Sequence, residues 1–272
     1  MNRYSLFLDI SGNIARETIN QSYYTVGGII LATGDVGKAR ATIGRVGRKW
    51  GDIDNTSATK MTEAILACSM AISARQIRKS QPCWDQFWND GDSFHNFMAS
   101  AERSKVGFVK SSNVIRYAAF CEGSAHSLGY CLQRHGLPRV VAPNGFFPLE
   151  LNVTSDTDIQ GQGNIDTFRY MWTEYQSRSK MRKKLGVEFK MQAIELKTEQ
   201  DEPLLLAPDF IAGCFQWYLG KPEVPLPRAI NESCTEAIIK EFQRSGNFVL
   251  TQTEFHLTYK EVFGNLFIQS KL

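Results

Sequence analysis

The sequence predicts an α/β fold in which helices flank a mixed β-sheet. Two strongly β-forming runs, residues 4–10 and 23–32, open the chain and are separated by turn-forming residues. We expect them to pair as antiparallel neighbours. In the second half strands alternate with helices, which is typical of parallel pairing. The sheet is therefore expected to have an antiparallel side and a parallel side.

The other elements are predicted from hydrophobic periodicity and from Gly and Pro near their ends. The helices are expected at residues 35–50, 59–79, 84–101, 113–135, 164–184, 204–219 and 231–244. Further strands are expected at residues 106–110, 147–155, 187–196 and 248–259. The strand at 149–155 is expected to lie beside residues 4–10 and parallel to them. Gly27 and Gly28 indicate a bulge or a close approach by another backbone.

The composition is that of an ordinary globular protein, with 272 residues of which 43% are hydrophobic and 22% are charged. A net charge of +3 is compatible with nucleic acid but does not imply it. The six cysteines show no C-x-x-C spacing, and we interpret them as free thiols in a reducing compartment. No signal peptide or membrane-spanning stretch is evident. The sequence predicts a soluble, cytoplasmic protein.

We expect one domain, residues 1–272. Within it, residues 51–105 are interpreted as a helical insertion and residues 228–272 as a C-terminal extension. The chain contains no G-x-S-x-G, P-loop or G-x-G-x-x-G motif, so serine hydrolase, kinase and dinucleotide-binding functions have no support. Its four histidines show no metal-binding spacing.

Asp9 is the most informative residue for function. It stands between Leu8 and Ile10 in a strand otherwise suited to burial, and a buried lone carboxylate costs several kcal/mol unless a partner compensates it. A divalent cation is one such partner. An arginine or backbone N–H groups are others, and capping of the turn at residues 11–13 is the main structural alternative. The residue type alone leaves these alternatives open.

Further acids follow two other predicted elements. Asp156 and Asp158 come at the carboxyl end of a strand, where ligands bind in open α/β sheets, although turn capping is an alternative for both. Asp209 lies in LLLAPDFIAG. If its helix begins at Pro208, Asp209 simply suits the helix dipole; if the helix begins near Pro203, Asp209 is buried and points at the sheet. Such separated acids suit hard cations in a two-metal phosphoryl-transfer site.

Three motifs, LFLDISGN, YYTVGGIIL and LLLAPDFIAG, resemble the bacterial domain-of-unknown-function family 3800 in order and rough spacing across nearly the whole chain. The resemblance implies an RNase H-like fold and a metal-dependent nuclease or related phosphoryl-transfer enzyme, with Mg²⁺ or Mn²⁺ as cofactor and a bacterial, phage-defence setting. It assigns the first acid to Asp9, the final-helix acid to Asp209 and the middle acid to Asp156, with Asp158 in reserve.

The chain departs from the family pattern at two positions. Ile10 replaces a Glu that follows the first Asp, and Pro208 replaces an Ala that precedes the last. Strand alternation would point the side chain at position 10 away from the face that carries Asp9. The lost carboxylate nevertheless leaves an alternative function, a catalytically degenerate RNase H-like module that binds nucleic acid or a protein partner.

Two other segments have functional interpretations. The basic segment, residues 177–184, is either a phosphate-contacting patch for RNA or DNA or a solvated helix end. Its cations are Arg178, Lys180, Arg182, Lys183 and Lys184. The aromatic segment, residues 84–97, is expected to form a core or a partner-binding face rather than a base-stacking platform. Its rings are Trp84, Phe87, Trp88, Phe94 and Phe97.

Overall fold

The computed structural model describes most of the first hundred residues, short parts of the middle and most of residues 187–260. The described residues are 3–14, 22–79, 82–101, 114–116, 119–120, 128–131, 134–135, 147–156, 165, 169, 187–221, 223–255 and 258–260.

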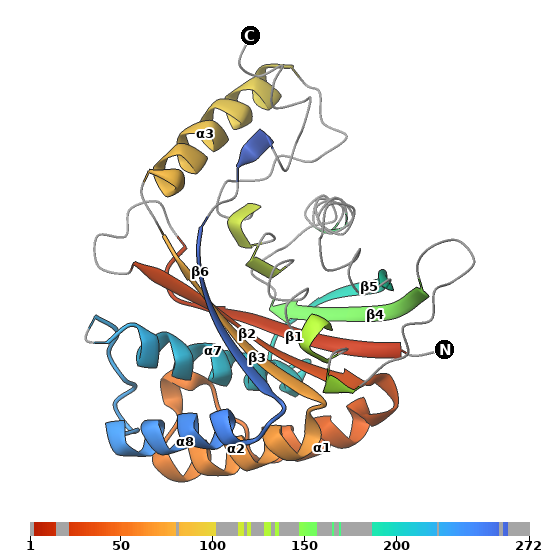
Figure 1. Cartoon of the computed structure of the whole chain (residues 1–272), viewed down its shortest axis with the longest axis vertical. Coiled ribbons are helices and arrows are strands. Elements are labelled where there is room, and N and C mark those ends of the chain that lie inside the picture. Colours follow the sequence, from red (N-terminus) through yellow and green to blue (C-terminus); the bar gives the residue numbers. More distant parts are fainter. Residues whose placement is uncertain are drawn as a thin grey trace.

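Six strands form one mixed sheet in the order β5-β4-β1-β2-β3-β6 (Figure 1). Their bounds are β1 Arg3–Ser11, β2 Tyr23–Ala32, β3 Ala71–Arg78, β4 Phe147–Asp156, β5 Val187–Lys197 and β6 Phe248–Glu254. The β1–β2 and β2–β3 pairs are antiparallel, whereas β1–β4, β4–β5 and β3–β6 are parallel. The predicted antiparallel hairpin and the parallel strand beside β1 are both confirmed.

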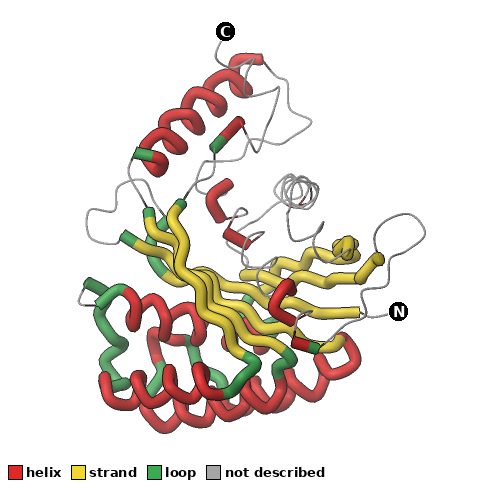
Figure 2. The backbone as a smooth tube through the Cα atoms, viewed as in Figure 1, coloured by secondary structure: helices red, strands yellow, loops and turns green. Residues whose placement is uncertain are grey.

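Helices form a layer on one face of this sheet (Figure 2). The layer contains α1 Val36–Val46, α2 Asn55–Cys68, α7 Leu206–Leu219 and α8 Glu232–Arg244, and α7 contacts β1, β2 and β3. Strand alternation divides the core accordingly. Phe7 and Ile29 face the α7 layer, whereas Leu6 and Leu8 face the opposite core, which includes residues of α3 Cys83–Ala101.

The prediction of one helix over residues 59–79 is wrong. The helix α2 ends at Cys68, and β3 begins at Ala71 between β2 and β6. Because β3 is buried on both faces, its sequence lacks the alternation of a half-exposed strand, and its apolar residues resemble a continuation of the helix. The strand belongs to the main sheet, so residues 51–105 are not wholly helical. The proposed domain limits stay a prediction.

The remaining predicted elements are largely found, with differences at their ends. The helix expected over 35–50 is α1 and stops at Val46, and Asp35 occupies its N-cap position without a side-chain cap hydrogen bond. The last strand stops at Glu254. Two short 3₁₀ turns, Trp50–Asp52 and Pro203–Leu205, precede α2 and α7. The strand predicted at 106–110 and most of the helices predicted at 113–135 and 164–184 lie outside the described residues.

The aromatic segment contributes to the core. The side chains of Trp84, Phe87, Trp88 and Phe94 are buried. The ring centroid of Trp84 lies 5.0 Å from that of Phe255. These rings are therefore engaged within the molecule, and the protein-partner surface considered for this segment has no support.

Two observations bear on the predicted compartment. The cysteines that the structure describes, at positions 68, 83, 131, 214 and 234, are all free thiols. Across the described residues, no helix combines the length and the apolar character needed to cross a membrane.

Candidate active site

A glycine in β2 lets α7 cross the sheet at very short range. A Cβ atom at Gly27 would lie 2.2 Å from the carbonyl oxygen of Pro208 and 2.8 Å from the backbone nitrogen of Ala212. Gly27 is the register partner of Asp9 across the β1–β2 pair. The close backbone approach expected at this glycine is confirmed, and it brings the first turn of α7, with Asp209, over the end of β1 that carries Asp9.

Polar contacts near both of its ends hold α7 at this position. The carboxylate of Glu202, just before the helix, accepts two hydrogen bonds from Arg40 of α1, at 2.9 and 2.6 Å. Near the other end, Gln216 accepts a 2.7 Å hydrogen bond from the Thr25 hydroxyl and donates one of 2.9 Å to the carbonyl of Tyr23. The helix is thus anchored to α1 at its start and to β2 at its end.

The connection between α1 and α2 packs directly on α7. The backbone N–H of Trp50 donates a 2.7 Å hydrogen bond to Oδ2 of Asp209. The Trp50 ring lies against Gly213, where an added Cβ would be 2.3 Å from ring atoms. These two contacts fix the carboxylate of Asp209 and also fix Lys49, the residue before Trp50, beside the same site.

Asp9 lies on the face of β1 that α7 covers, because it shares the parity of Phe7. Its Oδ1 accepts a 2.7 Å hydrogen bond from the backbone N–H of Ile10. A backbone N–H group was one of the partners that the sequence left open for this carboxylate, and the N–H of Ile10 is such a partner.

The pKa of Asp9 is raised well above its ordinary value. Burial is the largest cause, and the negative charge of Asp209 comes next. Asp156 and Glu199 raise the pKa further, whereas the hydrogen bond from Ile10 lowers it. Asp9 therefore lies within electrostatic reach of three other carboxylates.

Asp209 occupies the first turn of α7, which begins at Leu206 after a 3₁₀ turn, so the helix begins before Pro208. The sequence left two alternatives for Asp209, a position in the first helical turn or burial against the sheet. The structure combines them, since Asp209 lies in the first turn and is partly buried. Burial raises the pKa of Asp209 to about 6. The Trp50 hydrogen bond lowers this pKa, and the charge of Glu199 raises it.

Asp156 is the last residue of β4. The β1–β4 register pairs Leu8 with Ser155, so its continuation sets Asp156 beside Asp9. The structure therefore places Asp156 and Asp209 within electrostatic reach of Asp9, and the role of the three acids as a metal site stays a prediction. The other predicted site residues lie outside the described part of the chain: Asp158, Arg178, Lys180, Arg182, Lys183 and Lys184.

Glu199, which sequence reasoning missed, joins this group from the connection between β5 and α7. Its carboxylate forms a 2.7 Å ion pair with Nζ of Lys49. Glu199 follows the carboxyl end of β5 in the way that Asp156 ends β4, and these strands are parallel neighbours. The rule that ligands bind beyond the carboxyl ends of parallel strands could have identified Glu199.

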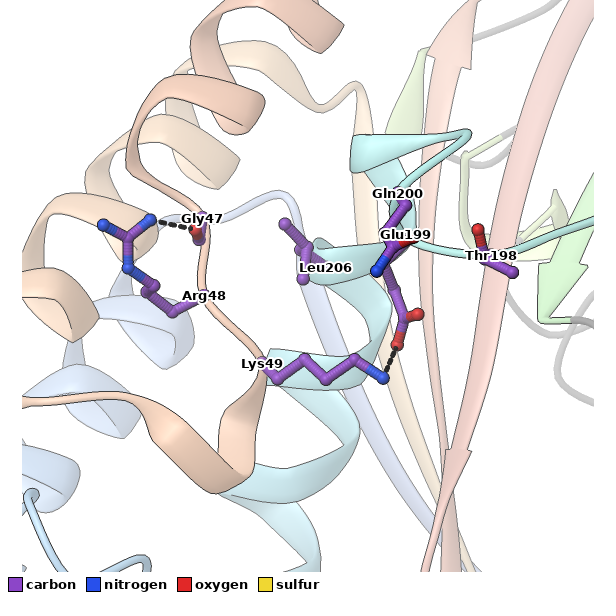
Figure 3. A pocket seen from close by; sticks show the side chains of 7 residues that line it. All are labelled: Gly47, Arg48, Lys49, Thr198, Glu199, Gln200 and Leu206. Carbon is purple, nitrogen blue, oxygen red and sulfur yellow. Dashed lines mark hydrogen bonds and ion pairs between the residues drawn. The ribbon is translucent and has the colours of Figure 1, made fainter.

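A cleft of about 300 Å³ adjoins Glu199 (Figure 3). It lies between the α1–α2 connection and the β5–α7 connection. Its lining residues are Gly47, Arg48, Lys49, Thr198, Glu199, Gln200 and Leu206.

The four carboxylates, named here the acidic cluster, consist of Asp9, Asp156, Glu199 and Asp209. Carboxylate oxygens are the donors that hard divalent cations prefer. Burial is the main cause of the raised pKa values of Asp9 and Asp209, and a cation would offset the further contribution that other acids make by repulsion. As placed, no three Asp, Glu, His or Cys side chains of the described residues are grouped closely enough to hold one ion. The cluster fits a cation in donor chemistry and charge, and side-chain adjustment would be needed to close the site.

Ile10 packs against the core on the side of the sheet opposite α7. A side chain at this position faces away from Asp9, as strand alternation predicts. An acid at position 10 would therefore not have joined the acidic cluster.

The topology defines the class of fold. An antiparallel β1–β2–β3 meander continues on the other side of β1 into the parallel strands β4 and β5, and α7 packs across the centre. This is a mixed α/β sheet of the RNase H-like type flanked by helices, and the predicted fold class is confirmed.

No model of a known protein family matches the sequence, and no curated protein matches it. Among solved structures, the chain is similar to a crystal structure of a mutant of Bst-RNase HIII, with a TM-score of 0.37 and 10% sequence identity. The similarity covers 90% of this chain and 64% of that chain, which is less than two thirds of its length.

Proposed function

We propose that this protein is a metal-dependent nuclease, or a related phosphoryl-transfer enzyme, that hydrolyses phosphodiesters, and that it belongs to the family 3800 that its motifs resemble. The observation that carries the proposal is the acidic cluster at the carboxyl end of β1. Its members Asp9 and Asp209 have raised pKa values, mainly because both are partly buried and further because other acids lie near them. Buried carboxylates that repel one another destabilise a fold, and such arrangements are concentrated at functional sites.

In this proposal, Asp9, Asp156 and Asp209 hold Mg²⁺ or Mn²⁺, with Glu199 as a fourth carboxylate and Asp158 in reserve. When bound, the cation supplies positive charge at the phosphate and lowers the pKa of water. The oxygen of water forms a bond to phosphorus while the bond to the leaving oxygen breaks. The attacking water loses a proton and the leaving oxygen gains one.

The substrate in this proposal is RNA or DNA. The basic segment, residues 177–184, would contact phosphates and contribute to affinity without selecting a sequence. Within the acidic cluster, the Trp50 N–H holds Oδ2 of Asp209, so the chain orients this carboxylate before any substrate binds.

The test is a cleavage assay with labelled single-stranded RNA, single-stranded DNA, DNA duplex and RNA–DNA hybrid, each in Mg²⁺, in Mn²⁺ and in EDTA. Wild type is expected to cleave at least one substrate in a metal-dependent way. Asp209→Asn, which keeps an acceptor for the Trp50 N–H, is expected to lose cleavage. Glu241→Gln, at an exposed position of α8, is the matched control and should cleave like wild type.

Two results would count against the proposal. Equal cleavage by Asp209→Asn and wild type would place the activity elsewhere. Binding of nucleic acid without cleavage of any substrate in either metal would favour the degenerate binding module instead.

A further inference from the structure

Glu199 is a member of the acidic cluster that is already paired with a cation. Its carboxylate meets Nζ of Lys49 across the cleft at 2.7 Å (Figure 3). The hydrogen bond to Glu199 is the main reason why the pKa of Lys49 is raised, and the charges of Asp156 and Asp209 raise it further. One ammonium group therefore offsets negative charge from several members of the cluster, although it touches only one of them.

The main chain beneath each partner of this ion pair is fixed. Lys49 precedes Trp50, whose N–H and ring are both held by α7, as described above. Glu199 lies in a turn that is closed by hydrogen bonds between Thr198 and Asp201. The Thr198 hydroxyl donates to the Asp201 carboxylate at 2.8 Å, and the Asp201 N–H donates to the Thr198 carbonyl at 3.1 Å. A change in the pairing of Glu199 therefore needs rotation of side chains and no movement of either connection.

The two partners differ in their exposure to solvent. The side chain of Lys49 is 57% exposed, whereas that of Glu199 is 13% exposed. When the pair opens, the ammonium group can turn into water, which already reaches more than half of its side chain. The Glu199 carboxylate stays largely covered beside other acids, so it needs a cation in place of the lysine. A divalent cation carries twice the charge of an ammonium group, and a partly exposed ion pair is weak enough to be displaced by it.

We propose that Lys49 is the counter-cation of the acidic cluster in the metal-free protein, and that it releases Glu199 when a divalent cation binds there. The inference rests on the proposed function, which supplies the divalent cation. It names the side-chain adjustment that the site requires, because the acids of the described residues are not grouped around one point while Lys49 holds Glu199. Lys49 is thus a positioning residue that competes with the cation for Glu199 and lowers the affinity of the cluster for metal.

The experiment is a calorimetric titration of the full chain with Mn²⁺ alone, without nucleic acid, so that it measures metal binding and not turnover. Mildly alkaline pH keeps Asp209 ionised, since the pKa of this group is about 6. Lys49→Met removes the competing charge and keeps much of the side chain's length, whereas Lys49→Arg keeps a cation. Lys60→Met, at an exposed position of α2, is the matched control. Thermal melts in EDTA check that each variant is folded.

Lys49→Met should bind Mn²⁺ more tightly than wild type, by roughly two- to fivefold, which is the range for the loss of one partly exposed competing ion pair. Lys49→Arg and Lys60→Met should bind like wild type. An ion pair that only links the two connections predicts the opposite, an unchanged or weaker affinity in Lys49→Met, and that result would overturn the inference. Equal tightening in Lys60→Met would also overturn it, because it would report net charge rather than competition at this site.

A second titration, with Glu199→Gln and with Glu199→Gln combined with Lys49→Met, tests whether Lys49 acts through Glu199. The amide cannot form the ion pair, so the gain from Lys49→Met should be smaller in this background than in wild type. A gain of the same size in both backgrounds, or no binding of Mn²⁺ by wild type and Lys49→Met alike, would overturn the inference. The failure of the proposed function has a different signature. A protein that binds Mn²⁺ more tightly after Lys49→Met but cleaves no nucleic acid would retain the counter-cation and lose the nuclease proposal.

Discussion

Asp209→Asn should make the metal-free protein more stable. The pKa of Asp209 is raised from 3.8 to about 6, mainly because the carboxylate is buried. One pH unit corresponds to 1.36 kcal/mol, so keeping this group ionised at neutral pH costs the fold about 3 kcal/mol. The amide does not ionise, and its oxygen can still accept the Trp50 N–H.

The sign of the pH dependence follows from the raised pKa. Below pH 3.8 the carboxyl is protonated in both the folded and the unfolded state, and the variant and wild type should be equally stable with respect to this group. As pH rises towards about 6, the unfolded state releases its proton first, and the wild-type fold loses stability relative to the variant. Above that pH the difference should stay constant at about 3 kcal/mol.

Urea unfolding in EDTA at a series of pH values, followed by circular dichroism, measures this difference. Glu241→Gln removes an exposed carboxylate and controls for net charge. The reasoning is refuted if Asp209→Asn is less stable than wild type at neutral pH, or if the difference between them does not change from acid to neutral pH.

Three further predictions concern the supports of the site and its proposed ligand. Gly27→Ala would set a Cβ atom 2.2 Å from the Pro208 oxygen, so it should lower the free energy of unfolding by about 3 kcal/mol or more in chemical denaturation; a change below 1 kcal/mol would contradict the close approach. Gly213→Ala should displace the Trp50 ring and quench or shift its fluorescence, with a smaller loss of about 1–3 kcal/mol. Neutralising Arg182, Lys183 and Lys184 of the basic segment, residues 177–184, should lower the slope of log K against log salt for nucleic-acid binding by roughly 0.7–0.9 for each lost contact. An unchanged slope would indicate that the segment is a solvated helix end.

The sequence predicts the centre of the fold better than its flank. The strands β1, β2 and β4 and the helices α7 and α8 carry clear patterns and turn residues at their ends, so their positions could be predicted. The strand β3 could not, since both its faces are covered and its residues between Ala71 and Arg78 show no period of two. Alternation of apolar and polar residues marks a strand that has one face exposed to solvent, and a strand with both faces covered shows no such alternation.

The candidate site was predictable where an acid interrupts an apolar element. Asp9 and Asp209 stand out for this reason, and Asp156 is found because it ends a recognisable strand. Glu199 and Lys49 lie in connections rich in other polar residues, where a charged side chain is ordinary. Their importance arises from the contact of two loops that are 150 residues apart in the chain, which local patterns cannot indicate.

The start of the helix that carries Asp209 could not be predicted from the sequence. The sequence offered a helix that begins at Pro208 or one that begins near Pro203, and each had its own consequence for function. The 3₁₀ turn at Pro203–Leu205 and the ion pair between the buried Glu202 and the exposed Arg40 set the start of α7 before Pro208. This choice depends on a tertiary contact with α1.

The measurement that tests the central claim most directly compares thermal melts of wild type and Asp9→Asn, in EDTA and in Mn²⁺. If Asp9 holds metal, the variant should be at least as stable as wild type in EDTA, because it lacks a partly buried carboxylate whose pKa is raised first by that burial and then by Asp209 and other acids. Wild type alone should gain stability from Mn²⁺, by about 2.7 kcal/mol at a hundredfold excess over the dissociation constant. A variant that melts lower than wild type in EDTA, with an equal response of both proteins to Mn²⁺, would make Asp9 a structural residue and contradict the nuclease proposal.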